Sequence, residues 1–147
     1  MLYESVISKD ERTNAAIAHS SIVLGLLSRG VLGVVLAVLI WATQRGKSKF
    51  AARQAAQAVW WQLIGVVASI AAFLGWGVLF AGSIFVPLLI DSNHPEPIMP
   101  YTMIPAFALI LVPIALTLVW VAYGVYAAWQ VWHGRDFSYP IIGRWIN

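Results

Sequence analysis

The sequence predicts an all-α integral membrane protein: a helical bundle of four hydrophobic segments, arranged as a short helical hairpin followed by two long transmembrane helices. Composition is the first reason, because 61% of the 147 residues are hydrophobic and only 10% are charged. An ordinary soluble domain carries about 25% charged residues. The second reason is that residues 54–90 and 97–134 contain no acidic or basic side chain. About 20 apolar residues in a helix cross a bilayer core, so each stretch is long enough to span a membrane.

The first segment, about residues 9–28, is expected to begin as a helix at Lys9. Ser8 and Glu11 have the spacing of a capping box, in which each side chain satisfies a free backbone amide of the other residue. A signal peptide is the competing interpretation, since Lys9 and Arg12 precede an apolar run. The acidic residues in that approach and the lack of a small-residue cleavage site count against it.

Residues 15–43 can be interpreted as one kinked helix or as parts of two short helices, 9–28 and 31–43. One helix would be about 43 Å long and would leave Arg29 near the middle of the membrane. Two helices turn at that residue and place it at the opposite surface. Basic residues otherwise cluster near the N-terminus, in residues 45–53 and near the C-terminus. The positive-inside rule puts these clusters on one face, which requires an even number of crossings and favours four segments with both termini cytoplasmic.

The long segments, about residues 55–90 and 103–133, complete a single transmembrane domain over residues 1–147. Pro113 lies inside the second long segment and should kink it, because proline removes one intrahelical hydrogen bond. Small residues four apart let helix backbones approach closely, and a glutamine in a span can hydrogen-bond to another helix. The helix-packing or partner-binding residues predicted on this basis are Gly77, Ala81, Gly124, Ala128 and Gln62.

Tryptophans and basic side chains mark where the chain meets the lipid headgroups. Indole rings prefer the headgroup level, and cationic side chains attract anionic lipids. Six of the eight tryptophans fall beside the basic clusters, which leaves Trp76 and Trp120 for the interior of the bundle. The predicted lipid-interface residues on the cytoplasmic side are Trp41, Arg45, Lys47, Lys49, Arg53, Trp60, Trp61, Trp129, Trp132 and Trp145.

Several short motifs follow one another in a characteristic order: Asp10-Glu11-Arg12, Ala18-His19-Ser20, Ile40-Trp41 with Arg45, Ala55 to Gln62, and Tyr126 to Trp129 with Ser138-Tyr139-Pro140. This order resembles a widespread family of small bacterial membrane proteins of unknown function, related to the Tic20-like proteins of the chloroplast inner-envelope protein-import translocon. The sequence departs from the family's usual pattern at Arg29-Gly30 and at Trp61. The resemblance implies a four-helix fold with both termini in the cytoplasm, and no particular reaction.

His19 is the candidate for chemistry within a hydrophobic segment, since an imidazole can bind a tetrapyrrole. A hydrogen bond between helices is the commoner role of such a histidine, so we expect a structural bond, with no cofactor and no metal. No carboxylate lies beyond the first turn of a predicted hydrophobic segment, and the chain has no cysteine, no phosphate-binding glycine loop and no paired histidines at metal-binding spacing. These features predict a protein that is not an enzyme.

The function expected from these features is that of a structural or accessory subunit that packs against a larger membrane complex. The alternative, suggested by the resemblance, is a pore-forming or translocase component, which at this size would need oligomers or partners. A tetrapyrrole-binding accessory subunit that uses His19 is a second alternative. Expected partners are membrane lipids with anionic headgroups on the cytoplasmic side and other membrane-protein subunits or copies of this chain, and not nucleic acid. The expected location is a bacterial inner (cytoplasmic) membrane, as a multi-pass protein.

Overall fold

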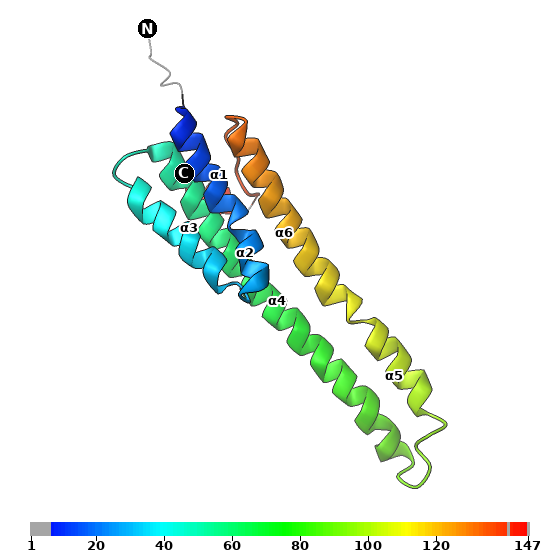
Figure 1. The fold of residues 1–147 in the computed structure, drawn as a ribbon. Coiled ribbons are helices and arrows are strands. Elements are labelled where there is room, and N and C mark those ends of the chain that lie inside the picture. Colours follow the sequence, from blue (N-terminus) through cyan, green and yellow to red (C-terminus); the bar gives the residue numbers. More distant parts are fainter. Residues whose placement is uncertain (1–6, 141, 147) are drawn as a thin grey trace. The chain divides into compact units, whose positions relative to one another are not determined.

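The computed structural model describes residues 7–140 and 142–146, and every regular element in these residues is helical. The chain divides into two compact units: Met1–Val66 with Trp120–Asn147 (unit 1), and Val67–Val119 (unit 2). The predicted all-α fold with four hydrophobic segments is confirmed. In order along the chain (Figure 1), the elements are α1 (Lys9–Ser20), α2 (Ile22–Leu27), α3 (Val31–Gln44), α4 (Lys49–Ile90), α5 (Met99–Ala108), α6 (Leu111–Trp132) and a short 3-10 helix, η1 (Ile142–Arg144).

Helix α4 and the stretch Met99–Trp132 are each long and apolar enough to cross a membrane, and α3 is a shorter apolar helix. Their large apolar side chains lie mostly at the surface; Val78 is 73% exposed and Leu89 is 85% exposed. A soluble protein rarely exposes so large an apolar surface to water. In a bilayer the same surface is covered by lipid. The chain is therefore a multi-pass membrane protein.

Helix α1 begins at Lys9, as the capping box predicts. The backbone N–H of Ser8 donates to Glu11 Oε2 at 2.8 Å, and the N–H of Glu11 donates to Ser8 Oγ at 3.2 Å. Hydrogen bonds from the Ser48 side chain and from Ser8 lower the pKa of Glu11, because they stabilise the carboxylate. The start of α1 is thereby fixed by local contacts.

The segment around Arg29 forms a hairpin and not one kinked helix. Arg29 has φ 54° and Gly30 has φ 94°, so the chain reverses through the left-handed region between α2 and α3. Glycine is required at position 30, because a Cβ there would lie 2.3 Å from Val66 Cγ2. Within unit 1, the start of α1, the connection between α3 and α4 and the end of α6 lie at one end of the helices, and the hairpin turn lies at the other (Figure 1).

Helix α4 begins at Lys49, earlier than the start near residue 55 expected from hydrophobicity. The first two turns carry Lys49, Arg53 and Gln54, which lower their hydrophobicity. Ser48 caps the helix, because the N–H of Ala51 donates to Ser48 Oγ at 3.0 Å. Lys49 and Arg53, which lie before the hydrophobic segment that the sequence predicted, are therefore part of a helix. The connection between α3 and α4 is reduced to residues 45–48.

Unit 2 contains the proline that was expected to kink the last segment. The helix is interrupted between Ala108 and Leu111, directly before Pro113, so α5 and α6 are separate helices. The N–H of Ile110 donates to Phe107 O, which leaves Ala106 O without its helical donor. The indole N–H of Trp76 on α4 donates to Ala106 O at 3.0 Å. Trp76 therefore supplies the hydrogen bond that the interruption removes.

A second proline of unit 2 is compensated in the same way. Pro87 lies inside α4 and has no N–H, so Ser83 O lacks its helical donor. The Thr102 hydroxyl on α5 donates to Ser83 O at 2.7 Å. An unpaired carbonyl in the hydrocarbon core costs several kcal/mol, since no water can replace the lost donor. These two side-chain bonds tie α4 to α5 within unit 2.

Replacing Thr102 with valine is expected to destabilise the fold by about 1–3 kcal/mol, because the nearly isosteric side chain leaves Ser83 O unpaired. Thermal unfolding in detergent measures the loss. Thr43→Val is the control, since Thr43 lies exposed on α3 and its hydroxyl bonds Leu39 O and Ile40 O within its own helix. Equal unfolding midpoints for the two variants would show that Thr102 does not compensate Pro87.

Candidate functional site: a buried polar network in unit 1

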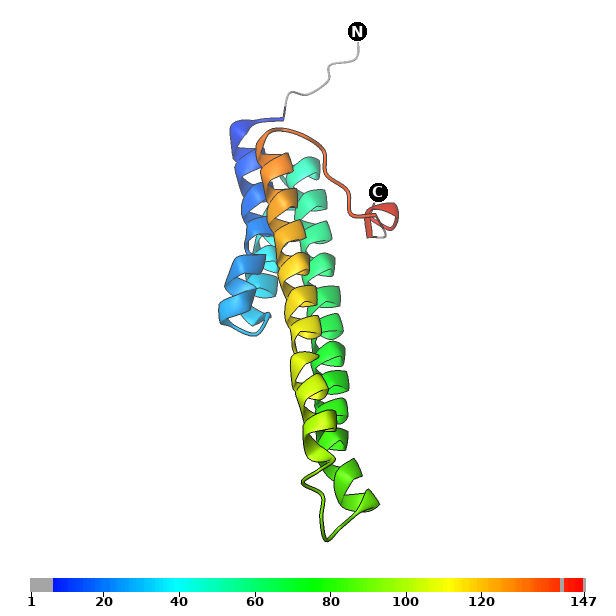
Figure 2. The ribbon, with the colours of Figure 1, turned by 90° about the vertical axis from the view of Figure 1, so that its right-hand side faces the viewer.

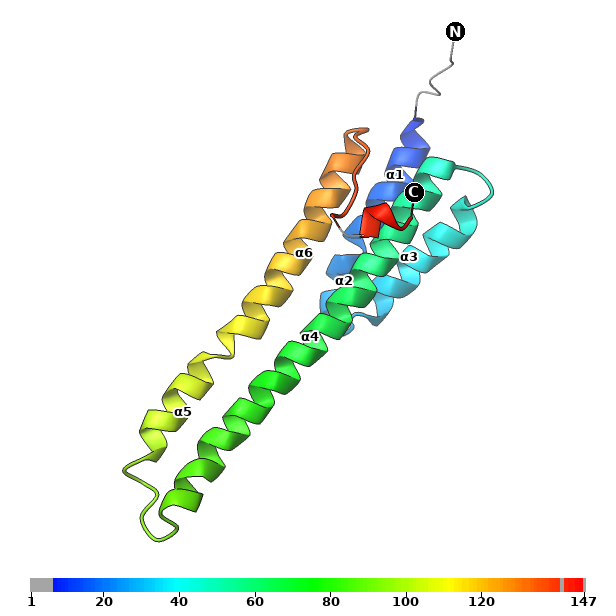
Figure 3. The same cartoon turned by 180° about the vertical axis from the view of Figure 1, so that it is seen from behind.

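Four buried polar side chains of unit 1 come from three parts of the chain. His19 lies on α1, Gln54 and Gln57 on α4, and Tyr139 in the C-terminal segment, residues 133–140 and 142–146; each is at most 1% exposed. Figure 3 shows the C-terminal segment, in red, against the first turns of α4. Buried polar groups are stable only when they are hydrogen-bonded, so their partners define what the site can do.

Both ring nitrogens of His19 are hydrogen-bonded within the protein. Nδ1 lies 3.1 Å from the Tyr139 hydroxyl, and Nε2 lies 2.9 Å from Gln54 Oε1. Gln54 Nε2 donates to Asp136 Oδ1 at 2.7 Å and to Phe137 O at 2.8 Å, which orients Gln54 Oε1 as the acceptor toward the ring. The bonds therefore assign the proton to His19 Nε2 and leave Nδ1 to accept from Tyr139.

Tyr139 holds the C-terminal segment in place at two points. Burial, with a smaller contribution from Tyr123, raises the pKa of Tyr139, so its hydroxyl stays protonated and donates to His19. Its backbone N–H donates to Gln57 Oε1 at 3.2 Å. The C-terminal segment is thus attached to α1 through one contact and to α4 through the other.

An ion pair closes the network at the surface. Arg53 Nη2 contacts Asp136 Oδ2, with the two side chains 33% and 55% exposed. Exposed pairs of this kind contribute about 0–1 kcal/mol, so the pair orients Asp136 more than it stabilises the fold. Arg53 was predicted to lie at the lipid interface, and in the structure its guanidinium also has a partner within the protein.

A second polar group surrounds Gln62 on α4. Gln62 Nε2 donates to Ser21 Oγ at 2.9 Å and lies 3.3 Å from Ala18 O. The Ser21 hydroxyl, at the junction of α1 and α2, lies 2.8 Å from Ala18 O and 2.9 Å from Gly33 O. These bonds join α1, α3 and α4 where the first helix is interrupted. Gln62 Oε1 is buried and has no hydrogen-bond partner among the described residues.

Trp61, which the sequence predicted at the lipid interface, lies partly buried in an aromatic stack within unit 1. Its ring stacks on Trp120 at 3.9 Å between centroids and on Tyr139 at 4.3 Å. The indole N–H of Trp61 donates to Trp120 O at 3.3 Å, and that of Trp120 donates to Trp61 O at 3.1 Å. A Cβ at Gly65 would lie 2.2 Å from Trp120 Nε1, so this glycine makes room for the stack.

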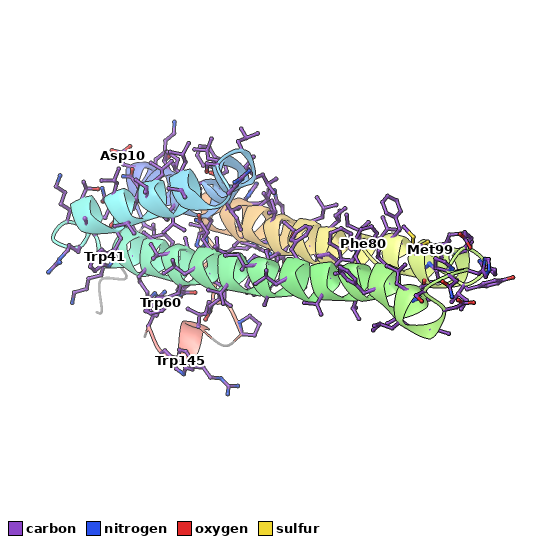
Figure 4. The ribbon with its side chains drawn as sticks, turned by 90° about the horizontal axis from the view of Figure 1, so that it is seen from below. Asp10, Trp41, Trp60, Phe80, Met99 and Trp145 are labelled. Atoms are coloured by element: carbon purple, nitrogen blue, oxygen red, sulfur yellow. The ribbon has the colours of Figure 1, made fainter. Side chains whose placement is uncertain are left out.

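The other five tryptophans predicted at the lipid interface have exposed side chains. Figure 4 shows Trp60 and Trp145 projecting outward from α4 and from the C-terminal segment. Arg45 lies over the ring of Trp41, with 5.2 Å between the guanidinium carbon and the centroid. The exposed fractions are 36% for Trp41, 53% for Trp60, 49% for Trp129, 51% for Trp132 and 77% for Trp145.

The two predicted small-residue pairs lie in different surroundings. A Cβ at Gly124 would lie 3.0 Å from the Ile22 side chain, and Ala128 on the next turn is 8% exposed, so this pair packs inside unit 1. No atom lies within 4 Å of a Cβ placed at Gly77, one turn before Ala81. The Gly124 pair is therefore a packing surface of the fold, whereas the Gly77 position is open.

Residues 10–146 match the model of the Magnetosome magnetite crystal formation protein family, MamF/MmsF. The chain belongs to this family. The match covers the buried network and both long helices. The sequence resembled small bacterial membrane proteins in general, and the match specifies a magnetosome family among them. No curated protein and no solved structure gave a match.

In this magnetosome-family protein, sequence reasoning found His19 and Gln62 but missed Gln54, Gln57 and Tyr139. One signal was available: two glutamines three residues apart share a face at the start of an apolar helix, which indicates buried partners. Nothing in the sequence pointed to Tyr139 as the partner of a residue 120 positions earlier. Among the described residues, no group of three or more histidine, aspartate or glutamate side chains could hold a metal ion.

Proposed function

We propose that this protein is a structural subunit of the magnetosome membrane, which contributes to magnetite crystal formation by associating with other membrane proteins and not by catalysis. The observation that carries the proposal is where the apolar and polar side chains lie. The outer surfaces of the two long helices are apolar, whereas the polar side chains of the network are buried inside the protein. His19, Gln54 and Tyr139 bond one another and so hold helices together. A catalytic or cofactor-binding role for His19 would require breaking one of these bonds.

The proposal predicts different effects of leucine at two glycines. Gly124→Leu should prevent correct folding, because its side chain would overlap Ile22. Gly77→Leu should leave the protein folded, since the position is open, but should reduce its recovery with partner subunits if helix association uses this close-approach surface. Isolation of the complex from native membranes in mild detergent, followed by quantification of co-purified proteins, measures the second effect.

Gly46→Leu is the control for Gly77→Leu, because Gly46 has no atom within 4 Å of its Cβ position and lies in the connection between α3 and α4. Full assembly of both Gly77→Leu and Gly46→Leu would remove the residue-level support for partner binding. Ion or solute flux through vesicles that contain the purified protein alone would contradict the structural role and favour the pore-forming alternative.

The proposed orientation places both ends of the chain in the cytoplasm. The hairpin returns the chain to the end of unit 1 at which α1 starts, so residues 45–48 share a side with that start whether or not the hairpin crosses the whole bilayer. The chain lacks cysteine, so single cysteines at Lys47, Ser92 and Ser138 can be labelled separately. We expect positions 47 and 138 to react from one side and position 92 from the other; labelling of 92 and 138 from one side would overturn this topology. Fractionation then distinguishes the magnetosome membrane from the inner membrane.

A further inference from the structure

We propose that unit 1 carries a discrete binding site for the phosphate group of an anionic phospholipid, formed by Lys9, Arg12 and Thr13 of α1 and Trp132 at the end of α6. These four residues line a pocket of about 150 Å³. One water molecule takes up roughly 30 Å³ of the liquid, so the space exceeds that of a single water. The site is independent of the structural role proposed above, because the Gly77 surface belongs to unit 2.

The helical spacing of α1 gives this pocket its charge. Arg12 and Thr13 lie three and four positions after Lys9, so the two residues flank the face of the helix on which Lys9 lies. Asp10 and Glu11 fall on other sides, since successive helical residues are about 100° apart. The Glu11 carboxylate is in addition engaged by Ser8. The Thr13 hydroxyl donates to Lys9 O at 2.9 Å within the helix, so the pocket presents two cations to a phosphate oxygen.

Arg12 is positioned by the turn that ends α6. A Cβ at Gly134, which has φ 77°, would lie 3.3 Å from Arg12 Cδ, so the side chain packs against this turn. Arg12 Nε is buried and has no hydrogen-bond partner within residues 7–140 and 142–146. The single ion pair of those residues joins Arg53 to Asp136 and does not involve Lys9 or Arg12. A buried guanidinium N–H without an acceptor is costly, so Arg12 gains from an anion in the pocket that draws its guanidinium into a hydrogen bond.

The surroundings point to a lipid as the source of the phosphate. Trp132 is 51% exposed and stands at the end of the uncharged stretch 97–134, where an indole marks the headgroup level. Figure 2 shows the start of α1 beside the end of α6, and the two helices share the core residues Ala15 and Val131. The pocket thus lies where a helix pair leaves the hydrocarbon, at the depth of phosphodiester groups.

The test compares lipid binding by two double variants that remove the same charge. The purified, delipidated protein is titrated with phosphatidylglycerol in detergent, and bound lipid is counted by native mass spectrometry. K9Q/R12Q is expected to bind at least about tenfold more weakly than the parent, since charge-assisted contacts to phosphate are lost. R29Q/R144Q should retain tight binding, because both side chains are exposed and neither lines the pocket. Equal losses in the two variants, or no loss in either, would overturn the site.

Competition with inorganic phosphate distinguishes a lipid headgroup from free phosphate as the ligand of the site. We expect millimolar inorganic phosphate to leave phosphatidylglycerol bound, and displacement at that concentration would overturn the assignment to a lipid. If K9Q/R12Q has a lower unfolding midpoint than the parent, K9Q alone replaces it, with R144Q as its control, since Lys9 and Arg144 are both exposed. Weaker lipid binding by K9Q but not by R144Q supports the site, and equal binding by both contradicts it.

Discussion

Replacing His19 with alanine is expected to destabilise unit 1 by about 2–4 kcal/mol, because two buried groups lose their partners and each costs about 1–3 kcal/mol. The Tyr139 hydroxyl would have no acceptor, and Gln54 Oε1 would have no donor. The substitution also leaves a cavity at a site that is 1% exposed. Thermal or denaturant unfolding of the purified protein in detergent measures the change.

His133→Ala is the matched control, because His133 is exposed and bonds only Trp129 O of its own helix. It should unfold like the parent. An unchanged midpoint for His19→Ala would show that the network around this ring does not hold the C-terminal segment. Purified protein should also lack visible absorption, and a tetrapyrrole spectrum that disappears in His19→Ala would assign the residue to a cofactor.

The features that the sequence predicted correctly follow from local rules. The capping box at Ser8 and the interruption before Pro113 each depend on residues within a few positions of one another. The reversal at Arg29 was one of two interpretations, and it was favoured because an even number of crossings places the basic clusters on one face of the membrane. Local backbone chemistry and the hydrocarbon solvent therefore account for most of the fold class.

The features that were missed depend on which side of a helix faces the protein. Trp60 and Trp61 stand beside the same basic cluster, yet Trp60 is 53% exposed and Trp61 is stacked between Trp120 and Tyr139. Adjacent helical residues point about 100° apart, so only one of the pair can face inward. The residues that surround Trp60 and Trp61 in the sequence could not show which of the two faces inward.

Contacts across long stretches of sequence were equally inaccessible. The C-terminal segment has no helical periodicity, so nothing indicated that Tyr139 would return to His19 or that Asp136 would reach Gln54. The small-residue pairs show the same limit, because Gly77 and Gly124 have identical spacing to an alanine but only Gly124 meets a neighbouring side chain. Such differences arise from packing, which a local pattern does not encode.

Replacing Gly33 with alanine is expected to destabilise the hairpin by about 1–3 kcal/mol, although alanine is the better helix former. An added Cβ at Gly33 would lie 2.5 Å from Gln62 Oε1 and 2.7 Å from Ser21 O. Ser21 O belongs to the backbone and cannot move aside without shifting the junction of α1 and α2. The clash would also disturb the bond between Gln62 and the Ser21 hydroxyl. The unfolding midpoint in detergent measures the effect.

Gly75→Ala makes the same chemical change in a helix interior where no atom lies within 4 Å of the new Cβ. Alanine gains about 1 kcal/mol over glycine in helix propensity, so this control should be unchanged or more stable. Opposite signs for the two substitutions would establish that Gly33 is required for close packing of α3 against the first helices. If Gly33→Ala stabilised the protein as Gly75→Ala is expected to do, there would be space for a Cβ at position 33, where the structure places Gln62 and Ser21. The arrangement of α1, α3 and α4 would then have to be revised.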